Sequence, residues 1–261
     1  MKNYKTIIVI AIFFACGLLF LLPRTTKKTE NQLVVGMMSG WAPFMSINGV
    51  GEYEGFDVDV AQEVARRLKK NIVIQDLGSL ASCFVALEQG KIDMIMSDLD
   101  ITEKRRQVFN MVRYAGNDVQ LFDLIFWNNV PANIKSMEDM RTLPDAVICV
   151  ESGSAQERFV DNYPSIVKKR LNSLVDIVLD LRFGKSWAAV LEPRIAARLQ
   201  KQNPELQRVS VALSAEFQVF GCGIAINKNN QQLADDVTQV VQDMMQDGTI
   251  KKLETKWQLE G

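Results

Sequence analysis

Strand-like and helix-like patterns alternate along the chain after residue 33, and this alternation most constrains the fold. Short apolar runs such as 33–36 and 188–191 are typical of buried strands. Between them, apolar residues recur with a helical period, as in the segment 56–69. Strand–helix alternation favours sheets that are covered by helices, with mostly parallel strands. We therefore expect an α/β fold.

The expected elements can be placed along the chain. We expect strands at 33–36, 71–75, 92–96, 119–127, 146–150, 188–191, 208–213 and 221–226. We expect helices at 56–69, 80–88, 154–162, 172–183, 193–202 and 233–244. A polar loop at 128–137 and a long extended segment at 209–220 suggest that the chain crosses twice between two lobes.

The first 23 residues form a separate segment that predicts export. Lys2 and Lys5 precede an uncharged stretch at 6–22, which is the pattern of a signal sequence or a short membrane anchor. Cys16-Gly17 is a weak lipobox. A lipidated Cys16, an uncleaved anchor and simple cleavage all remain open. Residues 24–32 are polar and indicate a tether, and each alternative places residue 33 onward outside the cytoplasm.

Composition excludes several classes of function. The chain of 261 residues has 30 basic and 31 acidic residues, so no strong overall field favours nucleic acid. It contains no histidine, which excludes a Ser-His-Asp triad and histidine-ligated metal sites. We expect no cofactor. Cys83, Cys149 and Cys222 have apolar neighbours and favour core packing, with a single disulfide as the alternative.

Several motifs resemble one family in their order and spacing. They are Gly55-Phe56-Asp57-Val58-Asp59, Leu87-x-x-Gly90-Lys-Ile-Asp93, Ser97-x-x-x-Ile101-Thr102-Glu103-Lys104-Arg105, Trp41-Ala-Pro43-Phe44 and Gly248-Thr-Ile-x-x-Leu253-x-x-Lys256-Trp257. Together they resemble the polar amino-acid-binding proteins of ABC importers, which are bacterial extracellular solute-binding proteins of family 3. The region 188–213 is most similar to the arginine-binding branch.

The resemblance implies a two-lobed, type II periplasmic-binding-protein-like fold. Each lobe would be a mostly parallel sheet flanked by helices, and two hinge segments would join the lobes. Residues 33–117 and 219–261 would form the first lobe, and 118–218 the second. The resemblance also implies the ligand-binding residues, which are Trp41, Leu80, Ser97, Asp98, Asp100, Arg105, Ser154, Ala155 and Glu192.

The chemistry of these residues suits an amino-acid zwitterion. Arg105 can bind a carboxylate with two parallel N–H bonds, and Thr102 is a plausible N-cap that would place it in a first helical turn. The helix that begins near Ser154 would offer free N–H groups to the same anion. By similarity, Glu192 binds the ammonium group, and Trp41 covers the ligand side chain opposite Leu80.

Two acidic residues depart from the family pattern. Asp98 and Asp100 stand where relatives carry small or hydroxyl residues, whereas Met38 replaces an acid that many relatives with basic ligands use. With Glu192, three carboxylates would face Arg105, and burying them without further cations is expensive. We therefore expect a ligand with an extra positive charge, such as arginine, lysine or ornithine. The alternative is that Asp98 points to solvent or pairs with Lys91 or Lys104.

The expected function is capture of an amino acid outside the inner membrane and its delivery to an ABC permease by hinge closure. The expected protein is a monomer, not an enzyme, that contacts the membrane only through its N-terminal anchor or lipid. One alternative is an exported cyclohexadienyl or arogenate dehydratase on the same fold, with Glu192 or Asp100 as general acid or base. A sensory receptor domain is a third interpretation, which the absence of a signalling domain after Trp257 disfavours.

Overall fold

The computed structural model describes residues 31–259, and the chain from residue 33 onward forms one compact unit. The predictions for the signal or anchor segment, for Cys16 and for most of the tether lie outside the described residues. Within 31–259, no helix has both the length and the apolar character needed to cross a bilayer.

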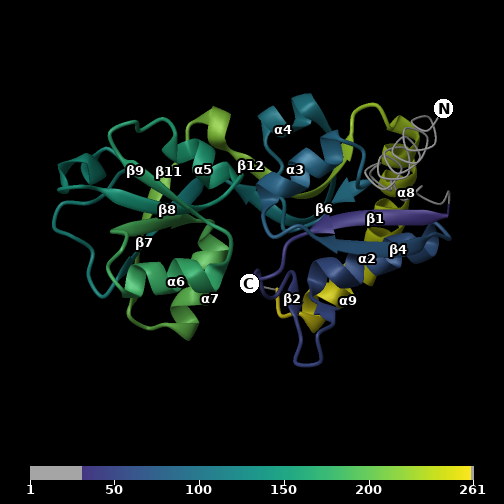
Figure 1. Ribbon diagram of the computed structural model, residues 1–261, viewed down its shortest axis with the longest axis horizontal. Helices are drawn as coiled ribbons and strands as arrows, with labels where there is room; N and C mark the ends of the chain where they lie inside the picture. Colours follow the sequence, from purple (N-terminus) through teal and green to yellow (C-terminus); the bar gives the residue numbers. More distant parts are fainter. Residues whose placement is uncertain (1–30, 260–261) are drawn as a thin grey trace, which may run out of the picture. The chain divides into compact units, whose positions relative to one another are not determined.

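The first of two five-stranded sheets is built mainly from the N-terminal part of the chain (Figure 1). Its strand order is β4 (Asn71–Asp76), β1 (Gln32–Met37), β5 (Met94–Ile95), β12 (Val219–Asn227) and β6 (Phe109–Val119). The helices of this lobe are α2 (Phe56–Arg67), α3 (Leu80–Glu88), α4 (Glu103–Val108), α8 (Gln231–Gln246) and α9 (Thr249–Lys256). The short strands β2 (Ser46–Ile47) and β3 (Tyr53–Glu54) pair separately.

The second sheet is formed by the middle of the chain. Its order is β11 (Leu206–Ala212), β7 (Leu121–Trp127), β10 (Ala188–Leu191), β8 (Val147–Glu151) and β9 (Val167–Leu171). Its helices are α5 (Ala155–Val160), α6 (Leu174–Arg182) and α7 (Pro193–Gln202), with the short 3-10 turns η1 (Asp139–Thr142) and η2 (Ala215–Phe217). These two sheets confirm the two-lobed α/β prediction.

Pairing within the sheets corrects one part of that prediction, because both sheets are mixed rather than mostly parallel. β1 pairs with β5, and β8 with both β9 and β10, in parallel. The pairs that involve β7 and β12 are antiparallel. The physical reason is that the chain enters and leaves the second lobe on long neighbouring strands, which run in opposite directions.

Most predicted elements lie within a few residues of the observed ones, and three match in full: α3, α7 and β10. The sequence prediction missed β6, β9, α9 and the short strands β2 and β3. β9 has the sequence Val-Lys-Lys-Arg-Leu and lies at the edge of its sheet. Its three consecutive basic residues lack the apolar pattern by which strands were predicted. β6 has neither a continuous apolar run nor a regular alternation of apolar and polar residues, and its burial varies irregularly along its eleven residues.

Burial explains the position of α2 and the apolar surroundings of the three cysteines. The face of α2 that carries Val60, Ala61 and Val64 is completely buried, as its apolar period predicts. Each fully buried valine contributes roughly 1.5–3 kcal/mol relative to an exposed one. Cys83, Cys149 and Cys222 are buried free thiols, which confirms the core-packing interpretation.

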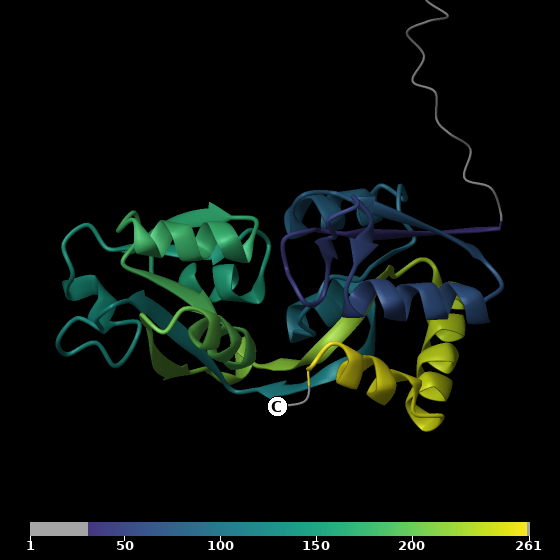
Figure 2. The same cartoon turned by 90° about the horizontal axis from the view of Figure 1, so that it is seen from below.

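Two segments connect the sheets, and they lie side by side (Figure 2). The first passes from β6 to β7 at Gln120, and the second runs from β11 through η2 to β12. Val119 pairs with Val219, and the N–H of Leu213 donates to the carbonyl of Gln120 at 2.9 Å. The loop at 128–137 is not a crossing, because Ile134 packs into the core of the second lobe. The lobe boundaries at 117/118 and 218/219 stay a prediction.

β12 contains a local irregularity close to this crossing. Its register with β6 shifts on both sides of Cys222. Gly221, directly before it, has φ of +76°, and a Cβ there would lie 2.8 Å from the carbonyl oxygen of Ala115. Glycine is therefore required at this point in the strand.

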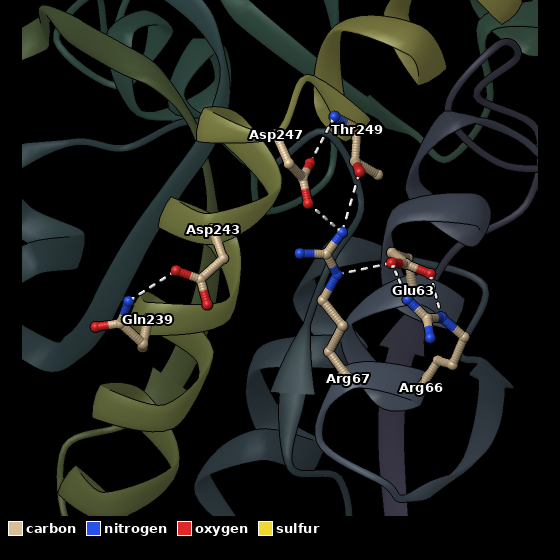
Figure 3. Close-up of polar contacts among 7 residues, drawn as sticks. All are labelled: Glu63, Arg66, Arg67, Gln239, Asp243, Asp247 and Thr249. Atoms are coloured by element: carbon tan, nitrogen blue, oxygen red, sulfur yellow. Dashed lines mark hydrogen bonds and ion pairs between the residues drawn. The ribbon is translucent and has the colours of Figure 1, made fainter.

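An arginine joins α2 to the C-terminal helices of the first lobe (Figure 3). Arg67 Nη2 lies 2.7 Å from Asp247 Oδ2 and 3.0 Å from Thr249 Oγ1, at the turn between α8 and α9. Its Nε donates to Glu63 at 2.7 Å. Neighbouring Arg66 binds only Glu63 in this group, from a side chain that is 69% exposed.

We predict that Arg67→Ala lowers the free energy of unfolding by about 0.5–1 kcal/mol, because the junction of three helices loses its charged hydrogen bonds. Arg66→Ala is the matched control, since it removes a Glu63 partner without touching α8 or α9. Urea denaturation of the two variants checks this. Equal shifts of the midpoint would show that the contact to Asp247 and Thr249 contributes nothing.

Candidate ligand-binding site

A small polar cavity lies where strands of both sheets end. It is lined by Trp41, Ser97, Asp98, Asp100, Glu151, Gln156, Leu191, Glu192 and Ile195. Ser97 follows β5, Glu151 ends β8, and Glu192 follows β10. In open α/β sheets, the carboxyl ends of strands are where ligands bind. The cavity offers only about 20 Å³, which is room for a water molecule but not for an amino acid.

The structure brings together five of the nine predicted site residues. Trp41, Ser97, Asp98, Asp100 and Glu192 line the cavity. Leu80, Arg105, Ser154 and Ala155 do not line it, although all four are buried. The assignment of all nine residues to the ligand stays a prediction.

Arg105 is held at the start of α4 and reaches across to the second lobe. The Thr102 hydroxyl accepts its N–H at 3.2 Å, as the N-cap prediction requires. The guanidinium donates to the carbonyl of Asp100 at 2.6 Å and to that of Gly153 at 2.9 Å. It also lies 5.2 Å from the centre of the Phe84 ring. Arg105 thus binds carbonyls of both lobes, one of them directly before the predicted anion-binding helix.

The turn before α5 is shaped by a close approach between the lobes. Ser154 caps α5 by accepting the N–H of Glu157 at 2.9 Å. Gly153 has φ of +84°, and a Cβ there would lie 2.8 Å from the backbone nitrogen of Ala81 in α3. The glycine therefore lets α3, which begins at Leu80, approach this turn.

Trp41 also spans the two lobes. Its ring is 5% exposed, and its Nε1 donates to the carbonyl of Asn172 at 3.2 Å. Met38 is buried, and its N–H donates to Ser97 Oγ at 3.3 Å. The side chain of Met38 therefore belongs to the core.

Asp98 binds an arginine that the sequence prediction missed. Arg194, in the first turn of α7, forms an ion pair with Asp98, and its Nε lies 2.7 Å from Glu192 Oε2. The alternatives for Asp98, solvent or a pair with Lys91 or Lys104, are wrong, because its side chain is only 9% exposed and its ionic partner is Arg194.

A buried carboxylate orients Asp98 from the other side. Asp57 Oδ2 accepts the N–H of Asp98 at 2.6 Å, and Oδ1 accepts the Tyr114 hydroxyl at 2.6 Å. Asp98 has φ of +46°, a conformation that few residues other than glycine adopt. Burial, with the nearby Asp98 charge, raises the pKa of Asp57 to about 7.

The other three carboxyl groups of the cavity, those of Asp100, Glu192 and Glu151, differ in the direction of their pKa shifts. Burial and the neighbouring Glu192 raise the pKa of Asp100 well above its usual range, and Asp100 donates a hydrogen bond to Glu192. Burial also raises the pKa of Glu192, but the Arg194 charge and this hydrogen bond outweigh it, so the net shift is downward. Burial raises the pKa of Glu151 well above its usual range. Its Oε1 is buried without a hydrogen-bond partner.

The sequence carried weak signals for the two missed residues. Glu151 directly follows the predicted strand 146–150 and lies two residues before Gly153, so it stands at a strand end like Glu192. Arg194 lies in the first turn of a predicted helix, two residues after Glu192. Among residues 31–259, no group of three or more acidic, cysteine or histidine side chains could hold a metal ion.

Comparison with known protein families identifies the chain. The family model described as "Bacterial extracellular solute-binding proteins, family 3" matches residues 33–260. The chain belongs to this family. This match confirms the resemblance that the motifs indicated.

Individual relatives of this family 3 protein are similar over most of its length. "Probable ABC transporter arginine-binding protein ArtJ" of Chlamydia trachomatis is 26% identical over 234 residues, which cover 89% of this chain and 88% of that protein. A crystal structure of a mutant of ArgBP from T. maritima has a TM-score of 0.76 and 28% identity, and the match covers 88% of this chain and 96% of that one. An ancestral amino-acid-binding protein, titled a precursor of cyclohexadienyl dehydratase, has a TM-score of 0.71 and 25% identity, covering 87% and 95%.

The Asp57 network makes a prediction about pH. Because the pKa of Asp57 is raised to about 7 in the folded protein, the folded state keeps a proton that the unfolded chain loses above about pH 4. This group's contribution to the free energy of unfolding therefore falls as pH rises from about 4 to 7, by at most about 1.4 kcal/mol per pH unit.

Replacing Asp57 with Asn removes this proton linkage. We expect Asp57→Asn to be about 1–3 kcal/mol less stable than the native chain near pH 4, because one buried hydrogen bond is lost, and this gap should narrow toward pH 7. Chemical denaturation of both proteins across this range checks the prediction. Parallel stability curves would show that Asp57 holds no proton.

Proposed function

We propose that this protein is the extracytoplasmic binding component of an amino-acid ABC importer and that it binds a basic L-amino acid of the arginine type. Membership of the solute-binding family supports the binding role. The arginine-binding relatives support the ligand class. The cavity supports both, because its lining is polar and acidic.

The observation that carries this proposal is the buried Oε1 of Glu151, which has no partner in a cavity lined by four carboxyl groups. An unpartnered buried carboxyl oxygen costs free energy unless a donor binds it. Asp98, Asp100, Glu151 and Glu192 face only two guanidinium groups, those of Arg105 and Arg194. Asp100 and Glu151, whose pKa values are raised, have no ion pair with either guanidinium, so a ligand with two positive groups would stabilise their ionised forms, and arginine has two such groups in its ammonium and guanidinium.

Each ligand group has a partner in this proposal. Arg105 and the N–H groups near Ser154 bind the ligand carboxylate, and the Asp100–Glu192 pair binds its ammonium. Glu151 binds the positive end of the side chain. The Trp41 ring covers the aliphatic part of that side chain, at the place where it contacts both lobes.

Binding requires the lobes to open and close. The cavity is too small for an amino acid, so the ligand enters only when the contacts between the lobes separate. These contacts include Arg105 to Gly153 at 2.9 Å and Gln156 Nε2 to Asp100 Oδ2 at 3.4 Å. A ligand that contacts residues of both lobes binds the closed arrangement more tightly, and this difference drives closure.

The protein acts as a carrier rather than an enzyme. A dehydratase would need a general acid or base aimed at a substrate atom, and Asp100 and Glu192 bind each other instead. The ancestral protein related to cyclohexadienyl dehydratase is itself titled an amino-acid-binding protein. The family therefore supports binding over turnover.

Its location and partners follow from this role. The N-terminal segment, which lies outside the described residues, exports the chain; a lipidated Cys16 or an uncleaved anchor would retain it at the membrane, whereas simple cleavage would release it. The closed monomer presents its amino acid to a permease of the inner membrane. Nucleic acid is no partner, because the net formal charge is −1.

A thermal-shift panel of the twenty amino acids and ornithine tests the proposed function. We expect arginine, lysine or ornithine to give the largest shift, since a ligand at 100 times its dissociation constant adds about 2.7 kcal/mol of stability. Arg105→Ala should abolish the shift, whereas Arg106→Ala, at the next position in α4, should keep it. A panel without any shift would contradict the function, and an Arg105→Ala affinity within twofold of native would contradict the carboxylate assignment.

The role of Glu151 gives a separate prediction. Glu151→Gln removes the charge but keeps the size, so we expect arginine affinity to fall by roughly 10- to 100-fold while binding of any neutral amino acid stays within threefold. Glu103→Gln is the control, because Glu103 is 62% exposed and pairs only with Arg106, at 3.9 Å. Calorimetric titration measures both. An equal loss for charged and neutral ligands would mean that Glu151 only shapes the cavity.

A further inference from the structure

Arg194 binds the two acids that would otherwise be the natural partners of a ligand cation. It forms ion pairs with Asp98 of the first lobe and with Glu192 of the second. Its Nη2 also lies 2.9 Å from Cys222 Sγ, and its guanidinium lies 4.9 Å from the centre of the Phe44 ring. One internal guanidinium thus has two carboxylates and an aromatic face as partners.

The surroundings of Arg194 fix it in this place. α7 begins at Pro193, whose φ is preset for a first helical turn, so the side chain leaves the helix directly beside Glu192. Asp98 is held toward it by the hydrogen bond from its N–H to Asp57 at 2.6 Å. Arg194 is 35% exposed and lines a second hollow together with Phe44 and Arg198, whereas its partners Asp98 and Glu192 line the cavity.

This arrangement divides the four carboxyl groups of the cavity into two pairs. Asp98 and Glu192 already share a permanent cation. Among the described residues, Asp100 and Glu151 have no such ion pair, because the nearby guanidinium of Arg105 donates to backbone carbonyls. A ligand therefore meets two acids that are compensated and two that are not. Without Arg194, all four would compete for the positive groups of the ligand.

We propose that Arg194 is a specificity-determining residue, an internal counter-cation that sets how much positive charge the cavity demands of its ligand. This inference rests on the proposed function, because it concerns which amino acid the same site prefers. By compensating Asp98 and Glu192, Arg194 lowers the penalty for a ligand with a neutral side chain. Its removal makes the cavity more acidic and more selective for cations.

The test compares arginine with citrulline, which has nearly the same shape but a neutral side-chain end. Calorimetric titration of the full chain gives the dissociation constant of each compound. The quantity to compare is the dissociation constant of citrulline divided by that of arginine. We expect Arg194→Gln to raise this ratio at least tenfold. Arg194→Lys, which keeps the charge, should hold it within threefold of the native ratio.

Two further variants make the result decisive. Arg198→Gln, one turn later in α7, removes a cation that lines only the second hollow and should leave the ratio within twofold. Asp98→Asn removes an acid while Arg194 stays, so the ratio should fall at least threefold. This opposite sign tests the proposal even where Arg194→Gln fails to fold.

The outcomes separate this proposal from the proposed function. Binding of arginine by the native chain, with a ratio that stays within twofold in both Arg194→Gln and Asp98→Asn, overturns the role of Arg194 and leaves the function standing. A ratio that falls in Arg194→Gln also overturns it. A native chain that binds neither compound in a titration up to millimolar ligand, and that shows no shift with any amino acid of the thermal-shift panel, overturns the proposed function itself.

Discussion

The arrangement of charges around the cavity depends on one buried carboxyl group that does not line it. Asp57 lies in the first turn of α2 and accepts hydrogen bonds from Tyr114 and from the backbone of Asp98. These bonds hold Asp98 in a left-handed conformation, in which its side chain reaches Arg194. α2, whose other buried residues pack in the core, therefore helps to fix where Asp98 and its ion pair with Arg194 lie.

Charge compensation then explains how so acidic a cavity can exist between two lobes. Burying several carboxylates without cations would cost more than the fold could offset. The protein reduces this cost in three ways. Arg194 compensates Asp98 and Glu192, Asp100 shares its proton with Glu192, and Glu151 has a raised pKa. The ligand supplies what these devices leave incomplete.

Local patterns predicted the elements well because they act over short distances. The apolar period of α2, the N-cap at Thr102 and the proline at the start of α7 each depend on neighbouring residues only. The two-lobed fold came from spaced motifs, which preserve topology over the whole chain. Arg194 could not be predicted in this way, because its meaning comes from Asp98, which lies 96 residues earlier in the chain. The mixed strand directions likewise depend on how distant strands pair.

The irregular point in β12 places the site in contact with the connection between the lobes. Cys222 stands where the register with β6 shifts, and its thiol contacts both Arg194 and Asp98. The bulge in β12 and the Arg194–Asp98 ion pair therefore contact each other through the Cys222 thiol. In the proposed closure mechanism, a change in this ion pair around a bound solute would act on β12, the strand by which the chain returns to the first lobe.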